Sequence, residues 1–295
     1  MRIDKKAIIV AGDIDADCLA AWYAKDFWHM PVCTHAHLDD ILKECQRQGI
    51  NFIIPTRDEE LLFWAEHRHH FEKHSIHVIV PSHESVMRCY DKLAFSRHGL
   101  ANAQPVIPSF EQMDEIRAER LVVKERFGSS KTKTMLNLSR EDAIQAATNC
   151  TQPIFQPYIA GREISADAWL NKHQRVKGII LRSRDKICDS EACVSTSFHD
   201  DELAQQLTVF LECLGLTGHV VTQLIIDENK NIHIIECNTR FGGASTLGIK
   251  AGLDSFYWSL REHIEGHVGA IPFTPATQPI RQLRIPCDHY FIPES

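Results

Sequence analysis

The segment NIHIIECNTRFGGAS, residues 231–245, joins an apolar strand to a run of polar side chains at the strand's end. Successive side chains of an extended chain alternate between two faces, so Glu236, Asn238 and Arg240 are expected on one face. Ile234 would share that face. Two glycines follow directly and allow a sharp turn or a close approach of the backbone. The pattern predicts a strand that directs a carboxylate, an amide and a guanidinium toward one place.

A partner strand is expected just before this segment, because HVVTQLIID, residues 219–227, is separated from IHIIECN by the polar loop ENKN. This spacing is typical of a β-hairpin. Pairing Asp227 with Ile232 places Gln223 opposite Glu236, with their Cβ atoms about 5 Å apart. Gln223, Glu236 and Asn238 would then converge as oxygen ligands that suit Mg²⁺ held together with substrate phosphates. A surface strand whose polar side chains pair with one another is the alternative.

Residues 1–90 alternate short apolar strands with helical segments. This alternation predicts an α/β lobe built on a parallel sheet with helices on both faces. Strands are expected in KAIIVA, NFIIPT and IHVIVPS. Asp58 is expected to cap the helix that follows it, and one continuous helix is expected through ESVMRCYDKLAFSRHG, residues 84–99.

The remaining chain predicts an α+β fold with antiparallel strands, which we divide into subdomains at 91–160 and 161–295. RLVVKERF is expected to be a strand carrying Lys124, and the polar loop GSSKTKT follows it. That loop offers backbone N–H groups, two serines and two lysines, as a cover over phosphate groups requires. The segment LRSRDKICDSEACVSTSF is expected to begin as a strand and to continue as a variable, charged stretch.

Composition excludes several classes of protein. The 295 residues carry a net charge of −7, which argues against a general nucleic-acid binder. No apolar run approaches the roughly 20 residues that span a bilayer, and the N-terminal segment reads as a strand rather than a signal peptide. The ten cysteines are scattered without a CxxC pair, which favours free thiols in the cytoplasm. His67, His70 and His74 fall at helical spacing; a solvated helix face is favoured there over a metal site.

Taken together, these segments resemble the ATP-grasp superfamily of ATP-dependent carboxylate ligases over most of the chain. CYDKLAF is similar to the family's Asp-Lys pair, and RLVVKERFGSS to its second phosphate lysine with the flexible loop. IFQPYIAGREISAD resembles the hinge strand that contacts adenine and ribose. The resemblance implies an α/β pre-ATP-grasp lobe followed by an ATP-grasp fold of two subdomains. It also implies nucleotide-binding roles for Lys92, Lys124, Ser129, Ser130, Gln156, Ile159 and Glu163.

Gln223 with ECNTR downstream resembles the branch around the large subunit of carbamoyl-phosphate synthase and stand-alone amino-acid ligases. A complete carbamoyl-phosphate synthase is excluded by length, because it needs two such modules. The chain also departs from the family. Gln156 replaces a more usual glutamate, the loop GSSKTKT has a single glycine, and LRSRDKICDSEACVSTSF only loosely follows the arginine-rich strand pair of relatives.

The resemblance implies phosphorylation of a small carboxylate by ATP, followed by attack of an amine or another nucleophile on the acyl phosphate. Mg²⁺, with Mn²⁺ as an alternative, would be held by Gln223, Glu236 and Asn238. Lys124 and Arg240 would stabilise the reacting groups, and Arg182 would hold the substrate carboxylate. The expected partners are a small carboxylic acid, such as an amino acid, and an amine, with no nucleic acid and no membrane. A homodimer is one expected assembly. A binding module without turnover and a carboxylate kinase are the alternatives.

Overall fold

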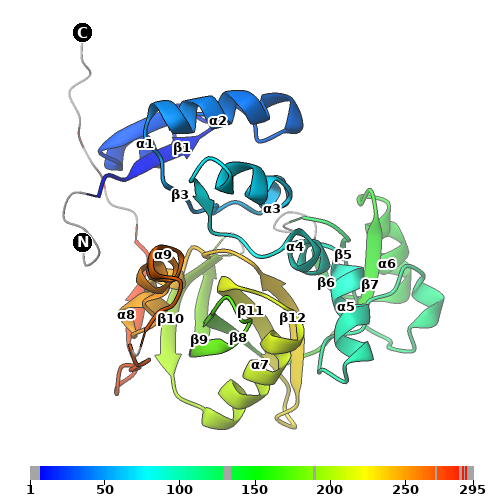
Figure 1. Ribbon diagram of the computed structural model, residues 1–295. Helices are drawn as coiled ribbons and strands as arrows, with labels where there is room; N and C mark the ends of the chain where they lie inside the picture. The colour runs from blue at the N-terminus through cyan, green and yellow to red at the C-terminus, as the bar shows by residue number, and fades with distance from the viewer. Residues whose placement is uncertain are drawn as a thin grey trace.

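The computed structural model describes residues 7–128, 134–188, 191–269 and 271–285, together with Asp288 and Tyr290. Within these residues the chain forms an N-terminal lobe, a three-stranded sheet and a six-stranded sheet. In Figure 1 the lobe, blue to cyan, lies above the six-stranded sheet, and the three-stranded sheet lies to one side of both. No described helix combines the length and the apolar character needed to cross a bilayer.

The N-terminal lobe contains parallel strand pairs, as predicted from its alternating strands and helices. Its elements are β1 (Val10–Asp13), α1 (Leu19–Tyr23), β2 (Asp26–His29), η1 (His35–His37), α2 (Leu38–Arg47), β3 (Phe52–Ile53), α3 (Asp58–Glu72), β4 (His77–Val78) and α4 (His83–Tyr90). β1 pairs with β2 and β3 with β4, which gives two separate pairs instead of the single expected sheet. β3 and β4 are too short to build a broad sheet, and apolar side chains of α2 and α3 supply most of the core.

The single helix expected over residues 84–99 is wrong, because the chain breaks at Asp91. This residue has φ −84° and ψ 101°, and it separates α4 from α5 (Lys92–Ala101). Its carboxylate accepts hydrogen bonds from the backbone N–H groups of Leu93, at 3.0 Å, and Ala94, at 3.2 Å. Asp91 is therefore an N-cap that starts a new helix at Lys92.

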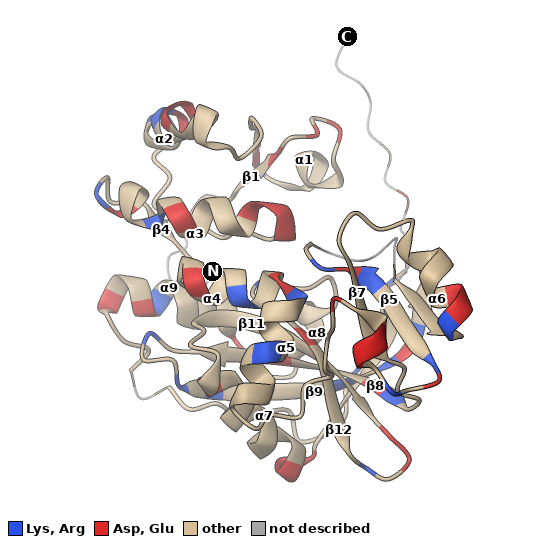
Figure 2. Ribbon diagram, turned by 90° about the vertical axis from the view of Figure 1, so that its right-hand side faces the viewer, with Lys and Arg blue, Asp and Glu red and all other residues tan. Residues whose placement is uncertain are grey.

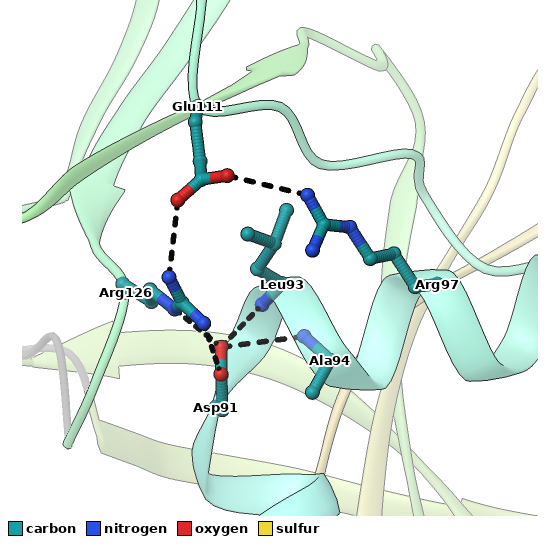
Figure 3. A network of polar contacts seen from close by, with 6 residues as sticks. All are labelled: Asp91, Leu93, Ala94, Arg97, Glu111 and Arg126. Carbon is teal, nitrogen blue, oxygen red and sulfur yellow. Dashed lines mark hydrogen bonds and ion pairs between the residues drawn. The ribbon is translucent and has the colours of Figure 1, made fainter.

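The same carboxylate binds Arg126, which lies just after the strand that carries Lys124. Arg126 donates to both oxygens of Asp91, at 2.8 and 2.6 Å (Figure 3). It also donates to Glu111 at 3.1 Å, and Glu111 accepts from Arg97 at 3.2 Å. The backbone N–H of Lys92 donates to the Arg126 carbonyl at 3.1 Å. This network fixes Lys92 relative to the three-stranded sheet.

The three-stranded sheet is antiparallel, with strand order β6-β5-β7. Its region comprises η2 (Met113–Glu115), β5 (Leu121–Glu125), β6 (Met135–Leu138), α6 (Arg140–Ala147) and β7 (Pro153–Pro157). Ser139 is the N-cap of α6, because its hydroxyl accepts from the Asp142 N–H at 3.1 Å.

The six-stranded sheet is antiparallel, with order β12-β11-β8-β9-β10-β13. Its region comprises β8 (Arg162–Leu170), β9 (Val176–Cys188), β10 (Glu191–Phe198), α7 (Asp201–Cys213), β11 (Gly218–Ile226), β12 (Ile232–Asn238), α8 (Ser245–Lys250), α9 (Ser255–Glu265) and β13 (Arg281–Leu283). In the stretch expected to be variable and charged, the described residues 181–188 and 191–198 form the end of β9 and the whole of β10.

The two faces of this sheet differ in character. One face packs against α7 and forms the largest apolar cluster, which includes Ile164, Leu207, Phe210 and Leu224. The opposite face carries polar side chains at its centre, where Asp167 and His219 contact the first residues of α8 and α9. Only this second face is available to build a polar site.

We predict that Phe210→Ala, which removes a fully buried ring from this core, lowers the free energy of unfolding by about 3–5 kcal/mol. Val209→Ala is the matched control, because Val209 is 52% exposed on the same helix. It should change the free energy of unfolding by about 0.5 kcal/mol or less. Urea unfolding measures both, and equal losses would contradict this assignment of faces.

Candidate active site

A cavity of about 480 Å³ lies where the N-terminal lobe and the two sheets meet. It brings together the following residues predicted from the sequence: Lys92, Lys124, Gln156, Ile159, Glu163, Gln223, Glu236, Asn238 and Arg240. Two further expected residues, Ser129 and Ser130, lie outside the described residues. Arg182 does not line the cavity, whereas Asp58, Tyr90 and Arg184 line it without having been predicted to do so.

The hairpin of β11 and β12 supplies the oxygen donors. Gln223 lies directly opposite Glu236, as predicted. The expected pairing of Asp227 with Ile232 is wrong, because Ile226 opposes Ile232. An irregularity between Gln223 and Leu224 shifts the register by one residue and so restores the Gln223–Glu236 pair.

The same irregularity changes the face of Ile234, which was expected beside Glu236. Ile234 and Cys237 both belong to the apolar core cluster, while Glu236 and Asn238 line the cavity, which Cys237 also reaches. The Asn238 amide N–H donates to one Glu236 oxygen at 3.0 Å. The side-chain oxygen of Asn238 and the second Glu236 oxygen form no hydrogen bond with another described side chain, and such a donor set fits Mg²⁺ bound with phosphate groups.

Two buried lysines face these donors from the other side of the cavity. Lys92 is 5% and Lys124 3% exposed. Burial lowers the pKa of Lys124 to about 8, and neighbouring Glu236 only partly opposes the shift. Burial also lowers the pKa of Lys92, again opposed by Glu236 and by Asp58. Desolvated cations grouped in a cavity are typical of a site that receives an anion.

The segment between the two sheets supplies an amide, from Gln156, and a carboxylate, from Glu163, to the cavity. Gln156 is buried on β7, and its amide N–H donates to the Ser109 hydroxyl at 2.7 Å. Glu163, at the start of β8, lies 3.1 Å from Arg184. Burial raises the pKa of Glu163, and the Arg184 charge opposes this shift. Arg184 therefore balances a carboxylate that is expected to meet hydroxyl groups.

Arg182 has a different environment from the one expected. It forms an ion pair with Asp167 at 2.6 Å, with side chains only 4% and 0% exposed. Burial would raise the pKa of Asp167, but Arg182, His219 and Ser245 hold it well below its usual range. Because Arg182 and Arg184 lie two residues apart on one strand, they share a face, and the sequence alone does not show which one Asp167 captures.

Arg240 is held by the N-terminal lobe. Its Nε donates to Asp58 Oδ1 at 2.7 Å, its Nη2 donates to Asp58 Oδ2, and its Nη1 donates to the Phe241 carbonyl at 3.1 Å. The prediction that Asp58 caps α3 is wrong, because the cap residue is Arg57 and Asp58 is the first helical residue. Figure 2 shows the acidic first turn of α3 in red, at the end of the helix nearer the three-stranded sheet.

We predict that Lys124→Met removes a pH-dependent part of the stability of the ligand-free protein. Above pH 8 the folded protein loses the Lys124 proton while the unfolded chain keeps it, so stability rises with pH. The wild type should gain about 2 kcal/mol over the variant between roughly pH 8 and pH 9.5.

Urea unfolding at several pH values measures this difference. Lys43→Met, which removes a lysine whose side chain is 75% exposed, is the matched control and should retain the wild-type slope. A Lys124→Met variant with the same slope as the wild type would show that Lys124 stays charged when buried.

Two family models match the chain. Residues 2–79 match the PylC-like N-terminal domain, and residues 149–284 match an ATP-grasp domain described as "ATP-grasp in the biosynthetic pathway with Ter operon". No curated protein matches the chain.

Solved structures with a similar fold are enzymes of low sequence identity. N5-carboxyaminoimidazole synthetase from Staphylococcus aureus complexed with ADP has a TM-score of 0.71 at 15% identity, over 93% of this chain and 74% of that one. L-amino acid ligase from Bacillus licheniformis has 0.68 at 16%, over 90% and 70%. Biotin carboxylase from Campylobacter jejuni has 0.68 at 18%, over 87% and 65%, so this chain spans slightly less than two thirds of that protein.

The predicted order of motifs, the fold and both family matches lead to the same assignment. Residues 149–284 match an ATP-grasp domain that follows a match to a PylC-like N-terminal domain, and the similar solved structures share the fold of the chain.

Proposed function

We propose that this protein is an ADP-forming carbon–nitrogen ligase that uses ATP to join a small carboxylic acid to an amine. One observation carries the proposal. Two buried lysines and an oxygen donor set, from the four elements α5, β5, β11 and β12, line a single cavity. A nucleotide with its metal ion satisfies both groups at once, because the phosphates take the lysines and the ion takes the oxygens.

The nucleotide would lie between the two sheets. Gln156 and Ile159 would meet the base, Glu163 the ribose hydroxyls, and Lys92 with Lys124 the phosphate oxygens. Gln223, Glu236 and Asn238 would hold Mg²⁺, with Mn²⁺ as a possible substitute, and the ion would neutralise charge on the phosphates. Ser129 and Ser130 are proposed as phosphate contacts from the sequence alone.

The carboxylic acid would lie beyond the terminal phosphate, next to Arg240. A guanidinium there stabilises the acyl phosphate and the negative oxygen that develops when an amine attacks. Leu61 and Val86 of the N-terminal lobe line the same cavity and would exclude water, which protects an acyl phosphate from hydrolysis. We do not assign the carboxylate to Arg182, since Asp167 already pairs with it.

The similar structures support this choice of reaction. They include an amino-acid ligase and a synthetase solved with ADP. One biotin carboxylase relative is described as a dimer, and a homodimer is proposed here on that basis. The cysteines of the described residues are free, which supports a location in the reducing cytoplasm.

The first test is ADP release at saturating Mg-ATP with pools of amino acids, other small carboxylates, ammonia and bicarbonate. A ligase gives a rise that depends on both a carboxylate and an amine. A carboxylate kinase responds to the carboxylate alone. Stabilisation by Mg-ATP in a thermal melt, without ADP release from any pool, would instead indicate a binding module.

We predict that Glu236→Gln lowers pool-dependent ADP release by about a hundredfold or more, because it removes the only carboxylate of the proposed metal site. The fold should persist, as judged by circular dichroism and an unchanged cooperative melt. Glu228→Gln, in the exposed hairpin loop, is the control and should retain wild-type turnover. Normal turnover by Glu236→Gln would overturn the metal assignment.

A further inference from the structure

The N-terminal lobe places a carboxylate beside the arginine proposed to act on the acyl group. Asp58 and Arg240 are 182 positions apart in sequence, yet Asp58 accepts from both Nε and Nη2 of Arg240. Their side chains are only 12% and 15% exposed, and both residues line the cavity. Of the described lobe residues that line this cavity, Asp58 is the only one with a carboxylate.

This carboxylate is not needed for the cap of α3. Its negative charge is opposite in sign to the charges of Lys92, Lys124, Arg184 and Arg240, which line the same cavity. The cap position belongs to Arg57. A simple carboxylic acid approaching Arg240 would meet the negative charge of Asp58 at close range, which disfavours its binding. The presence of Asp58 therefore calls for a ligand that carries a positive group beside its carboxylate.

An α-amino acid has this arrangement, since its ammonium and carboxylate groups are attached to one carbon. When such a ligand lies against the Arg240–Asp58 pair, its carboxylate can contact the Arg240 guanidinium. Its ammonium group can contact the Asp58 carboxylate at the same time. Arg has five N–H donors, and an ionised carboxylate has about four acceptor sites, so both groups can bind the ligand without releasing each other. The pair itself is then a preformed, neutral receptor for a zwitterion.

We propose that Asp58 determines substrate specificity by binding the ammonium group of an α-amino acid whose carboxylate is activated next to Arg240. This inference rests on the proposed ligase function and names its substrate class. The ammonium group keeps its protons throughout, so no covalent step is added to the reaction. Asp58 acts in discrimination between substrates, and Arg240 remains the group that faces the reacting carbonyl.

The test compares each amino acid with its des-amino analogue in the ADP-release assay: alanine with propionate, glutamate with glutarate, and phenylalanine with 3-phenylpropionate. The wild type should prefer the amino acid of the responding pair. Asp58→Asn keeps the shape of the side chain and removes its charge. It should lower kcat/KM for the amino acid by about tenfold or more, mainly through KM, and lower the value for the analogue by less, so that the preference for the amino acid falls.

Glu59→Gln is the matched control. It makes the same change one residue away, at a side chain that is 60% exposed, and should preserve the preference. A thermal melt with and without Mg-ATP checks that each variant folds and binds nucleotide.

The outcomes separate the two proposals. If Asp58→Asn lowers turnover equally for an amino acid and its analogue, Asp58 only positions Arg240 and the specificity role is wrong. If the wild type responds to plain carboxylates and not to amino acids, the ligase proposal stands and this inference fails. If the wild type releases no ADP with any carboxylate and amine, both fail.

Discussion

A break in the alternation of one strand allows β12 to serve a core and a cavity together. With strict alternation, Ile234 and Glu236 would share a face, and either the core would receive a carboxylate or the cavity an isoleucine. The register shift opposite Gln223 removes that conflict. Ile234 and Cys237, three positions apart, both belong to the apolar cluster that includes residues of α7, while Glu236 and Asn238 line the cavity. The proposed metal donors, and the position of Arg240 beyond them, depend on this shift.

The sequence was most informative where periodicity and turn chemistry act locally. The β11–β12 hairpin and the strand β5 that carries Lys124 follow directly from such patterns. The irregularity in β12 left no signal, and the pair Gln223–Glu236 was predicted from a loop register that is one residue off. The cap that Asp91 forms at Leu93 and Ala94 is local, but the pairing of Asp91 with Arg126, 35 positions away, was hidden. Local patterns do not encode interactions of this range.

Site residues divide in the same way. The sequence motifs predicted the lysines, the glutamate and the asparagine that line the cavity. Asp58 and Arg184 were not predicted to line it, because each is held there by an ion pair with a residue from another segment. Arg182 and Arg184 have the same residue type and lie on the same strand face. Only the position of Asp167 on β8 decides that Arg182 is neutralised and that Arg184 faces the cavity. The ion pair between Arg182 and Asp167, which lie on different strands, thus leaves Arg184 as the arginine of this strand that lines the cavity.

The charge balance of the cavity also explains why its parts come from three regions of the chain. Ion pairs hold Arg184 and Arg240, but burial lowers the pKa of both Lys92 and Lys124, which shows that their charged forms are destabilised in the ligand-free protein. The anionic nucleotide proposed for this cavity would relieve that cost, and it would contact the two sheets and the lobe together. At a ligand concentration 100 times its Kd, binding to the folded state alone adds about 2.7 kcal/mol to stability. The buried lysines therefore lower the stability of the ligand-free protein. Binding of an anion would stabilise the contacts between the lobe and the two sheets.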